Sequence, residues 1–554
     1  MNSLFFILLS IFHLSYQKSS LESQYYTATV VEYGALDPTN PQDSPVEKNG
    51  EIYRSYIEEA GKHDADIIVF PEDGLTSVNL PDRDQMDTWA TLVPLNYTPC
   101  NQTTIQVHKV LSLLSCAAVE AQIYVVVNIA EKLPCNVENC PRDKVLYYNC
   151  QVVFDRDGKI IAKYRKTNLF SEPQFNVTPE PEIVTFQTDF GVTFGTFICF
   201  DILFKEPGIT LTRKLNITDI VYSTAWFSEL PFLSAIQTQY GWSYAEDVNF
   251  LASGYNRVEF GNGGSGIYLG RNGICKTKEL SAGNELIICN VPKKNRNIDL
   301  IAIDEAAIRL HENRKNAQEI EHVHDELRKR EISDIQLYHD DLSLFKSIPL
   351  NSSLQHTLCD GNFCCDFDVD ISYTDSNSIY KLVAYDGIRT FIAERRTVGI
   401  QTCAVVQCAN DSITSCGLRS NSQTTFNYIQ INATFIDYAD MIILPSSVDV
   451  DLLPLVNWTY KEYFDDNKVH ITASLDSNPV KDLLTCGIYI RIFSRDVETT
   501  SRMISTLQIA TIIALVAISI FFLFLYRKGW RVPIRRGSQA NQEPYHSLQS
   551  TGSK

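Results

Sequence analysis

The sequence predicts a layered α/β domain, a smaller β-rich domain and one membrane-spanning helix. From about residue 25 to 300, short apolar runs alternate with helical stretches, which is typical of a layered α/β core. Residues 340–490 carry short alternating runs and seven cysteines, a pattern that indicates a disulfide-bearing β domain. Residues 504–526 form an apolar stretch of 23 residues without a charge, which is long enough to cross a bilayer.

The apolar runs predict where the strands of the α/β domain lie. We expect strands at residues 26–31, 67–70, 123–129, 152–154, 194–200, 220–222 and 250–252, and helices near residues 48–62, 104–121, 207–216 and 233–248. The sequence Asp155-Arg156-Asp157-Gly158 predicts the turn of a β-hairpin, so the sheet is not purely parallel. Residues 301–339 contain a polar, helix-prone stretch that predicts a surface connector helix.

The ends of the chain predict a type I membrane protein. Residues 1–17 have the apolar centre of a signal peptide, although a basic start is missing. Basic residues follow the span at once, as expected for a cytoplasmic tail over residues 527–554. A buried core helix is the alternative interpretation of the span. Eight glycosylation sequons precede it: Asn96, Asn101, Asn176, Asn216, Asn351, Asn410, Asn432 and Asn457. The folded part is therefore expected on the extracellular or lumenal side of the cell membrane.

Composition narrows the class of partner. The 554 residues carry a net charge of -18, and a nucleic-acid partner would need a basic face instead. The cysteine pairs lack the spacing of a zinc site, and His322 and His324 point to different sides of a helix. We therefore predict no metal and no cofactor. The sequence gives no indication of the oligomeric state.

The cysteine count is odd, at fifteen, and an oxidising compartment favours pairing of most of them. Cys199 is the candidate for a free thiol. Seven other cysteines precede residue 300 and seven follow it, so either one disulfide joins the halves or each half keeps another free thiol. Cys116 lies in an apolar, helical context and is a candidate for an unpaired core residue.

Three candidate chemical groups each follow a predicted strand. Cys199 ends a continuous apolar run, Glu72 follows the run at 67–70, and Lys166 belongs to a basic stretch after the hairpin. Ligands bind at strand ends in open α/β sheets. Each residue also has an ordinary interpretation: a buried inert thiol, a loop acid and a solvated basic surface.

Several strings resemble the vanin and biotinidase branch of the nitrilase superfamily. They are residues 170–175 (FSEPQF), 194–204 (FGTFICFDILF), 224–226 (TAW), Leu230-Pro231 and 264–268 (GSGIY). The resemblance covers residues 25–490 and implies a four-layer α-β-β-α sandwich. It also implies a catalytic triad at Glu72, Lys166 and Cys199. Residues 253–257 depart from the family's usual string, which affects the shape of the substrate pocket.

The resemblance implies an amidase whose substrate is a linear small-molecule amide. Cys199 is the expected nucleophile and Glu72 the general base, while Lys166 and the Phe200 backbone N–H stabilise an oxyanion. Glu172 is expected to position the triad. Hydrolysis of pantetheine is preferred, with cleavage of biotinyl amides such as biocytin, or a non-catalytic surface ectodomain, as alternatives. Acyl transfer in place of hydrolysis uses the same residues, so the sequence leaves it open.

Overall fold

In the part of the chain that the structure describes, the α/β domain contains two six-stranded sheets and three α-helices. The structure is a computed structural model that describes residues 18–498 apart from 39, 41–42, 137–139, 295–334, 336, 376–377, 392–395, 456–457, 466–467 and 477–478. The first sheet contains β1 (Tyr25–Glu32), β2 (Ile67–Val69), β3 (Tyr124–Pro134), β4 (Val145–Phe154), β5 (Ile160–Arg165) and β13 (Glu285–Pro292). The second contains β6 (Thr185–Gln187), β7 (Thr193–Ile198), β8 (Asp219–Thr224), β10 (Asn249–Gly254), β11 (Ser265–Leu269) and β12 (Ile274–Lys278). The helices are α1 (Val46–Lys62), α2 (Lys109–Ala121) and α3 (Ala235–Glu246).

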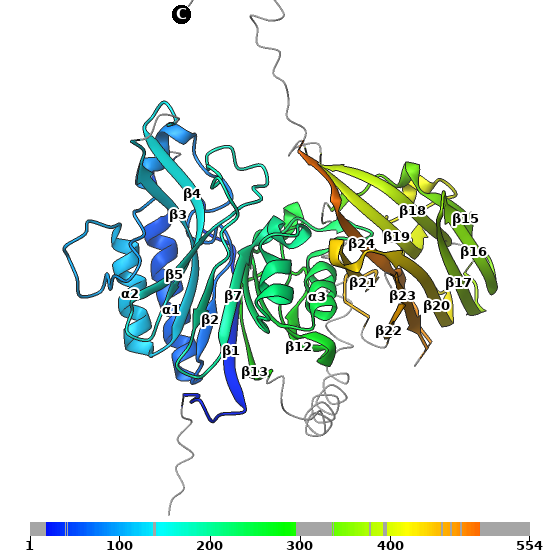
Figure 1. Ribbon diagram of the computed structural model, residues 1–554, viewed down its shortest axis with the longest axis horizontal. Helices are drawn as coiled ribbons and strands as arrows, with labels where there is room; N and C mark the ends of the chain where they lie inside the picture. The colour runs from blue at the N-terminus through cyan, green and yellow to red at the C-terminus, as the bar shows by residue number, and fades with distance from the viewer. Residues whose placement is uncertain are drawn as a thin grey trace, which may run out of the picture. The chain divides into compact units, whose positions relative to one another are not determined.

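The two sheets have matching topologies. Figure 1 labels all six strands of the first sheet, and β7 and β12 of the second. Their strand orders are β13-β1-β2-β3-β4-β5 and β12-β11-β10-β8-β7-β6. Strands β1, β2 and β3 run parallel in the first sheet, as do β10, β8 and β7 in the second. The outer pairs are antiparallel, including the predicted hairpin β4–β5. Glu72 and Cys199 lie in loops at the carboxyl ends of the parallel strands β2 and β7, and Lys166 lies in the loop that follows β5.

Burial of both faces of each sheet produces four layers. Ile57 of α1 and Leu114 of α2 share an apolar core with Ile68 on the outer face of the first sheet. Ile67 and Val221, one from each sheet, belong to the core between the sheets. Helix α3 packs on the outer face of the second sheet. Neighbouring residues of a strand point to opposite faces, so a strand buried on both faces is a continuous apolar run. The α-β-β-α sandwich is therefore confirmed.

Two elements differ from the sequence-based expectation. The stretch near residues 207–216 forms only a short π-helix, Thr210–Lys214, and α2 begins at Lys109 because His108 caps its first turn. The imidazole Nδ1 of His108 accepts a hydrogen bond from Val110 N–H at 3.2 Å. Residues 104–107 therefore precede the helix.

The C-terminal domain is a sandwich of two five-stranded antiparallel sheets. One contains β15 (Lys346–Pro349), β18 (Ile379–Phe391), β19 (Arg396–Cys408), β24 (Leu483–Glu498) and β21 (Met441–Asp449), in that order. The other contains β16 (Leu354–Asp360), β17 (Phe363–Tyr373), β20 (Thr425–Ile436), β23 (Lys468–Leu475) and β22 (Trp458–Asp465). An apolar core that includes Phe367, Val405 and Ile431 fills the space between them. The predicted β-rich domain is confirmed.

Helix α3 joins the two domains into one core. Trp242 of α3 belongs to the same buried cluster as Leu444 and Tyr489 of the C-terminal domain. A Cβ atom at Gly241 would lie 2.7 Å from the Pro445 carbonyl oxygen, so only glycine permits this close approach. Both faces of α3 are therefore covered, one by the second sheet and one by the C-terminal domain.

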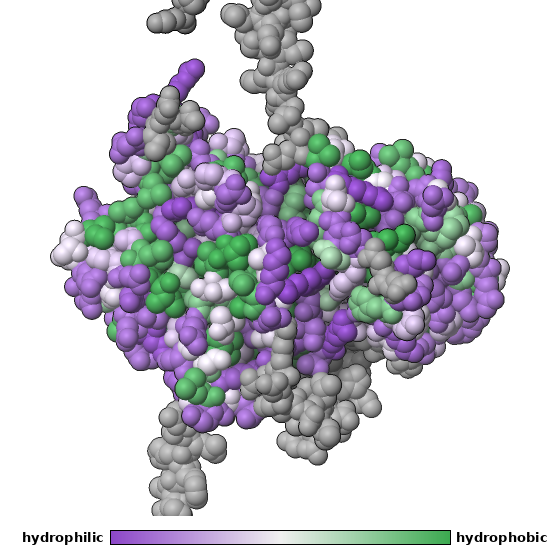
Figure 2. All heavy atoms as spheres, in the orientation of Figure 1, coloured by the Kyte–Doolittle hydropathy of each residue, from purple (hydrophilic) through white to green (hydrophobic). Residues whose placement is uncertain are grey.

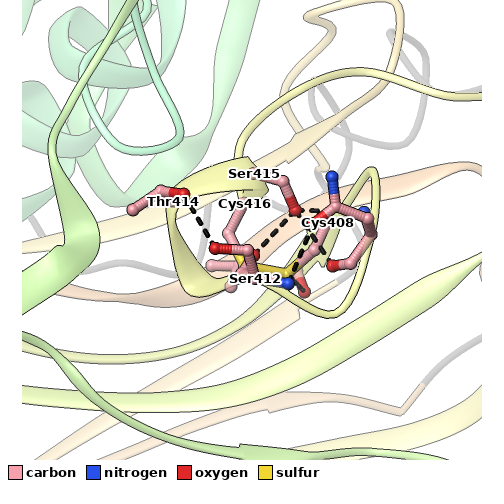
Figure 3. Close-up of a disulfide and its surroundings, with 7 residues drawn as sticks. Cys408, Ser412, Thr414, Ser415 and Cys416 are labelled. Carbon is pink, nitrogen blue, oxygen red and sulfur yellow. Dashed lines mark hydrogen bonds between the residues drawn. A yellow bond between two sulfur atoms is a disulfide. The ribbon is translucent and has the colours of Figure 1, made fainter.

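Six disulfides pair twelve of the fifteen cysteines. They are Cys100–Cys116, Cys135–Cys140, Cys275–Cys289, Cys359–Cys364, Cys365–Cys403 and Cys408–Cys416. The last closes a turn in which the Ser415 hydroxyl donates to the Ser412 carbonyl oxygen at 2.7 Å (Figure 3). Cys116 is not an unpaired core residue, because the preceding loop brings Cys100 to it. Cys199 is free as expected, and Cys150 and Cys486 are the additional free thiols, one in each half.

Several predictions concern residues outside those that the structure describes. They are the signal peptide at 1–17, the connector helix within 301–339, the sequon at Asn457, the span at 504–526 and the tail at 527–554. Within the described part of the chain, no helix has the length and apolar character needed to cross a membrane. The domain boundaries at residues 300, 340 and 490 stay predictions.

The described sequons differ in exposure. Asn96, Asn101, Asn216, Asn351 and Asn410 have exposed side chains. Asn176 and Asn432 are half-buried, and the Asn176 side-chain oxygen accepts hydrogen bonds from Arg83 and from Tyr147 N–H. On the face shown in Figure 2, hydrophilic residues are interspersed with apolar ones, as is usual for a protein surface.

An ion cluster at the domain junction supports the shared core. Strand β14 (Tyr338–His339) pairs in parallel with β9 (Glu229–Leu230). The Arg389 guanidinium, which is 8% exposed, binds Glu229 of the α/β domain and lies 3.2 Å from the Asp340 carboxylate. One buried cation thus holds two carboxylates that approach it from different parts of the chain.

Replacing Arg389 is expected to weaken this junction. Arg389→Ala leaves two carboxylates without their cation, and breaking a buried ion pair in this way costs about 3 kcal/mol or more. The measurement is the free energy of unfolding by denaturant. Arg495→Ala is the matched control, because Arg495 pairs with Asp386 in the same domain and its side chain is 39% exposed. We expect that control to cost under about 1 kcal/mol. Equal losses of unfolding free energy in the two variants would contradict a larger stabilisation by the junction ion cluster.

Candidate active site

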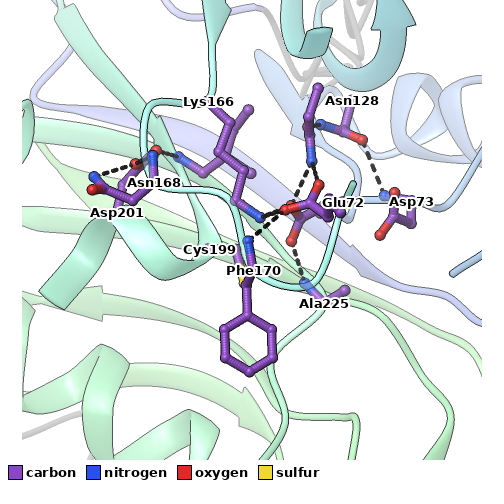
Figure 4. A network of polar contacts seen from close by, with 12 residues as sticks. Glu72, Asp73, Asn128, Lys166, Asn168, Phe170, Cys199, Asp201 and Ala225 are labelled. Atoms are coloured by element: carbon purple, nitrogen blue, oxygen red, sulfur yellow. Dashed lines mark hydrogen bonds and ion pairs between the residues drawn. The ribbon is translucent and has the colours of Figure 1, made fainter. Parts of the chain in front are cut away.

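The candidate residues meet at the carboxyl ends of the strands (Figure 4). Glu72 follows β2 of the first sheet, and Lys166 directly follows β5 of the same sheet. Cys199 follows β7 of the second sheet and opens the 3₁₀ helix η2 (Cys199–Leu203). The three residues are 1%, 2% and 6% exposed. The face-to-face stacking of the two sheets thus brings together side chains separated by up to 127 residues in sequence.

Lys166 lies between two carboxylates. Its Nζ is 2.6 Å from Glu72 Oε1 and 2.5 Å from Glu172 Oε2. Asn149 links the same two acids, because its Nδ2 donates to Glu72 Oε1 at 2.8 Å and to Glu172 Oε1 at 2.5 Å. Asn128 in turn donates to the Asn149 side-chain oxygen at 2.5 Å. Each of these buried polar side chains therefore makes at least one hydrogen bond or ion pair within the cluster.

The second oxygen of Glu72 faces the other sheet. Glu72 Oε2 accepts a hydrogen bond from Ala225 N–H, which follows β8, at 2.9 Å. This bond, together with those from Lys166 and Asn149, holds the carboxylate in one orientation. The phenol of Tyr222 on β8 donates to the Cys199 carbonyl oxygen at 2.9 Å. The second sheet therefore positions both the acid and the backbone of the thiol residue.

Cys199 occupies a strained backbone conformation. Its φ of 46° lies in the left-handed region, where residues with a Cβ atom are uncommon. Asp201 supports the sharp turn: its Oδ2 accepts hydrogen bonds from Ile198 N–H at 3.1 Å and from the Tyr164 hydroxyl at 2.7 Å. The turn between β7 and η2 thus directs the thiol toward the site instead of continuing the strand.

Burial and charge set the protonation states of the cluster. Burial opposes the charge of Lys166, but Glu172 and Glu72 outweigh it and hold the lysine pKa well above its usual range. Burial, reinforced by the charge of Glu72, raises the pKa of the Cys199 thiol well above its usual range, and Lys166 only partly opposes this. At neutral pH the site therefore holds a permanently charged ammonium and a protonated thiol.

Asp73 is a further buried acid of the cluster. Burial, with the charges of Glu72 and Glu172, raises its pKa well above the usual range. Its backbone N–H donates to the Asn128 side-chain oxygen at 3.0 Å. Asp73 therefore limits how many carboxylates in this space are ionised together.

The structure brings every sequence-predicted triad and supporting residue to one place. Glu172 contacts Lys166 directly, and the Phe200 N–H lies in the first turn of η2, next to the thiol. Sequence reasoning missed Asn128 and Asn149. Each is a polar residue inside the apolar run of a buried strand, and such exceptions are the signal that points to them.

Aromatic side chains pack around Phe200, the residue after Cys199. The Phe170 ring lies 5.1 Å from the Phe200 ring and 6.1 Å from the Phe227 ring, measured between centroids. Among the described residues, no group of three or more His, Cys, Asp or Glu side chains is arranged to hold a metal ion. A buried thiol beside a carboxylate and an ammonium is suited to nucleophilic chemistry on a carbonyl carbon.

Comparison with known proteins also indicates an enzyme that acts on a carbon–nitrogen bond. A family model described as Carbon-nitrogen hydrolase matches residues 14–238, and one described as Vanin C-terminal domain matches residues 335–496. Vanin-like protein 1 of Drosophila melanogaster is 35% identical over 514 residues, which cover 86% of this chain and 87% of that protein. Pantetheinase of Homo sapiens is 32% identical over 432 residues, 74% of this chain and 79% of the relative. Biotinidase of Homo sapiens is 28% identical over 513 residues, 86% and 90% of the two chains.

These similarities extend across both domains. The two family models lie on either side of the junction, and the match to the fruit-fly relative runs through most of both chains. The α/β sandwich with its Glu72, Lys166 and Cys199 cluster, followed by the disulfide-bearing β sandwich, is therefore a carbon–nitrogen hydrolase that belongs to the vanin family.

Proposed function

We propose that the protein hydrolyses a linear secondary amide through a thioester on Cys199, with pantetheine as substrate and pantothenate and cysteamine as products. The observation that carries the proposal is the buried Lys166 ammonium held between Glu72 and Glu172, beside a free thiol. Pantetheinases of three further mammals lie among the similar proteins, at 29–31% identity where the human enzyme shows 32%. These similarities favour pantetheine over a biotinyl amide.

Glu72 is the proposed general base. The Cys199 thiol is protonated at rest, so it needs a proton acceptor as it attacks. Lys166 cannot serve, because its two carboxylate neighbours keep it charged. As the bond between Sγ and the carbonyl carbon forms, the thiol proton passes to a Glu72 oxygen and the carbonyl electron pair moves onto its oxygen.

Lys166 and the backbone N–H of Phe200 are the proposed partners of that oxyanion. The first N–H groups of a helix lack partners within it, so the Phe200 N–H is available at the start of η2. A charged ammonium in a buried site stabilises developing negative charge far better than water does. Glu172 keeps Lys166 in place without touching the substrate, and this is its proposed role.

Collapse of the tetrahedral intermediate breaks the carbon–nitrogen bond. The leaving amine takes the proton from Glu72, and the acyl group stays on Cys199 as a thioester. Water then attacks the thioester and gives its proton to Glu72, which returns a proton to the departing thiolate. The products are a carboxylic acid and an amine, and the enzyme regains its starting state.

The setting of this chemistry is also proposed. The disulfides indicate an oxidising compartment, in agreement with an extracellular or lumenal site. We propose a signal peptide at residues 1–17, glycosylation at the exposed sequons and a single membrane span at residues 504–526. Deglycosylation followed by mass measurement tests the sequons, and partition into detergent tests the span.

The first prediction concerns the substrate. Purified protein given pantetheine is expected to release cysteamine, whereas biocytin is expected to release no lysine. Cys199→Ala should abolish release while keeping the folded state, which circular dichroism checks. Lysine release instead of cysteamine would assign a biotinyl amide, and release from neither would contradict the proposed substrate class. Unchanged release by the variant would contradict the nucleophile.

The second prediction separates the roles of Glu72. Glu72→Gln removes the base, so turnover should fall by roughly 10²- to 10⁴-fold. The same change removes a negative charge beside Cys199, and therefore lowers the thiol pKa. The pH midpoint for alkylation of Cys199 by iodoacetamide, followed by peptide mass spectrometry, should shift downward. A loss of turnover with an upward shift would show that Glu72 does not act on the thiol in this way.

The third prediction concerns Lys166 and pH. Burial raises the pKa of Glu172 above its ordinary 4.5, and the Lys166 charge opposes that rise. In Lys166→Met the pKa of Glu172 in the folded protein rises further above 4.5. Protonation of Glu172 then contributes fully to the free energy of unfolding below pH 4.5, and this contribution is lost as the pH increases through the folded-state pKa. The melting temperature should therefore fall more steeply between about pH 5 and 8 than in the wild type.

Lys132→Met is the control for this experiment. Lys132 pairs with Asp87, whose side chain is 71% exposed, so its loss should leave the wild-type slope. A Lys166→Met variant with the same slope as the control would contradict the sharing of one cation by two buried acids.

A further inference from the structure

A hairpin of the C-terminal domain contacts the α/β domain beside the candidate active site. Strand β18 ends at Phe391 and strand β19 begins at Arg396, so the two residues lie at the same end of the β18–β19 pair, where they are paired in register. The Phe391 ring meets the Phe200 ring edge-on at 5.0 Å, and Arg396 Nη1 donates to the Asn168 side-chain oxygen. Phe200 follows the nucleophile, and Asn168 lies two residues after Lys166.

We infer that Arg396 is a positioning residue for the hydrolysis: it holds the lysine loop, residues 166–170, against the η2 turn that carries Cys199. The C-terminal domain thereby completes the active site of the α/β domain. This inference rests on the proposed function, since it assigns Lys166 a role in the reaction. The hydrogen bonds and ion pairs given above for Cys199, Glu72, Asp73 and Glu172 do not involve Arg396.

Asn168 transmits the contact. Its backbone N–H and its side-chain Nδ2 both donate to Asp201 Oδ1, each at 2.8 Å. Figure 4 shows Asn168 and Asp201 on one side of Lys166 and Glu72 on the other. Asp201 also accepts from Ile198 N–H at 3.1 Å, which fixes the start of the nucleophile turn. Asn168 therefore links the lysine loop to the turn that carries Cys199.

Arg396 determines which way the Asn168 amide points. The guanidinium has no acceptor, so it binds only the amide oxygen and leaves Nδ2 directed at Asp201. Asn168 is 5% exposed, and an unpaired buried carbonyl oxygen costs roughly 1–3 kcal/mol. Loss of the arginine is therefore expected to turn the amide or shift the lysine loop toward water.

A second set of contacts fixes the guanidinium over the same turn. The Arg396 Cζ atom lies 5.0 Å from the centroid of the Phe204 ring, and that ring meets Phe200 at 5.0 Å. A cation over an aromatic face is a directional, favourable contact. Phe391 thus contacts Phe200 and Arg396 contacts Phe204, so the same end of the β18–β19 pair packs on both aromatic residues of the turn that follows Cys199. The reaction depends on the position of Lys166, and a displacement of about 1 Å would lower the rate by up to about 10²-fold.

The experiment compares Arg396→Ala with a matched interdomain variant. Arg271 of the α/β domain forms an ion pair with Glu462 of the C-terminal domain at 3.0 Å, and its side chain is 47% exposed. Arg271→Ala removes an arginine that crosses the same junction but is not among the contacts of the lysine loop. Arg396→Lys keeps the charge and can still donate a hydrogen bond to Asn168 but lacks the planar guanidinium, so it should retain part of the activity that Arg396→Ala loses.

Two measurements are made on the full protein. The first is kcat and KM for pantetheine, and we expect Arg396→Ala to lower kcat by about tenfold or more with KM changed less than about twofold. The second is the pH midpoint of Cys199 alkylation by iodoacetamide, which requires no substrate assignment. Displacement of the lysine charge should move this midpoint upward, whereas Arg271→Ala should leave both measurements at the wild-type values.

Asn168→Ala and the double variant complete the test. If Arg396 acts through Asn168, the double variant should be no worse than the poorer single variant. Additive losses, or equal values for Arg396→Ala and Arg271→Ala, would overturn the inference, as would a change in KM alone. A wild-type protein that cleaves no amide would overturn the proposed function instead, while an upward alkylation shift confined to Arg396→Ala would still support the positioning role.

Discussion

One buried ammonium group governs the architecture of this protein. Lys166 is surrounded by carboxylates and is almost fully withdrawn from water, so each charge in the cluster requires the others. Asn149 donates to the same Glu72 oxygen that Lys166 contacts, and the Ala225 N–H donates to the other oxygen, so the carboxylate has little freedom to turn. The cost of burying these charges is sustained by two fully packed sheets, and the gain is a lysine whose protonation is independent of pH in the physiological range.

The same cluster explains why the fold needs two layers of sheet. The first sheet alone supplies the lysine and the acids, and the second supplies the thiol and the N–H group that orients Glu72. A single sheet would leave the carboxylates open to water, where their attraction for the lysine is several times weaker. Stacking of the sheets therefore creates the low-dielectric environment and also brings the Cys199 thiol to the Glu72 carboxylate. The C-terminal domain then packs on α3 and beside the turn that carries Cys199.

Much of this could be predicted from the sequence, because the governing patterns are local. Glu72 follows a continuous apolar run, Cys199 ends one, and Lys166 follows the hairpin strand, while the resemblance of the surrounding strings to one family assigned the three to a single triad. Asn128 and Asn149 could not be placed, because their partnership depends on the antiparallel pairing of β3 with β4. The contact between Arg396 and Asn168 joins residues 228 apart, and no local pattern marks it. The pairing of Cys116 with Cys100 depended in the same way on the path of a loop.

Helix α3 limits how this protein can be divided. Ten of its twelve residues are buried, and its apolar side chains face the second sheet on one side and the C-terminal sandwich on the other. A fragment ending after β13 would present to solvent the face that contacts the C-terminal sandwich, including Tyr240, whose ring lies 6.0 Å from that of Trp458. Apolar patches of that kind drive self-association of soluble fragments. We therefore expect the hydrolase part to remain soluble only when it is produced together with the C-terminal sandwich that covers this face of α3.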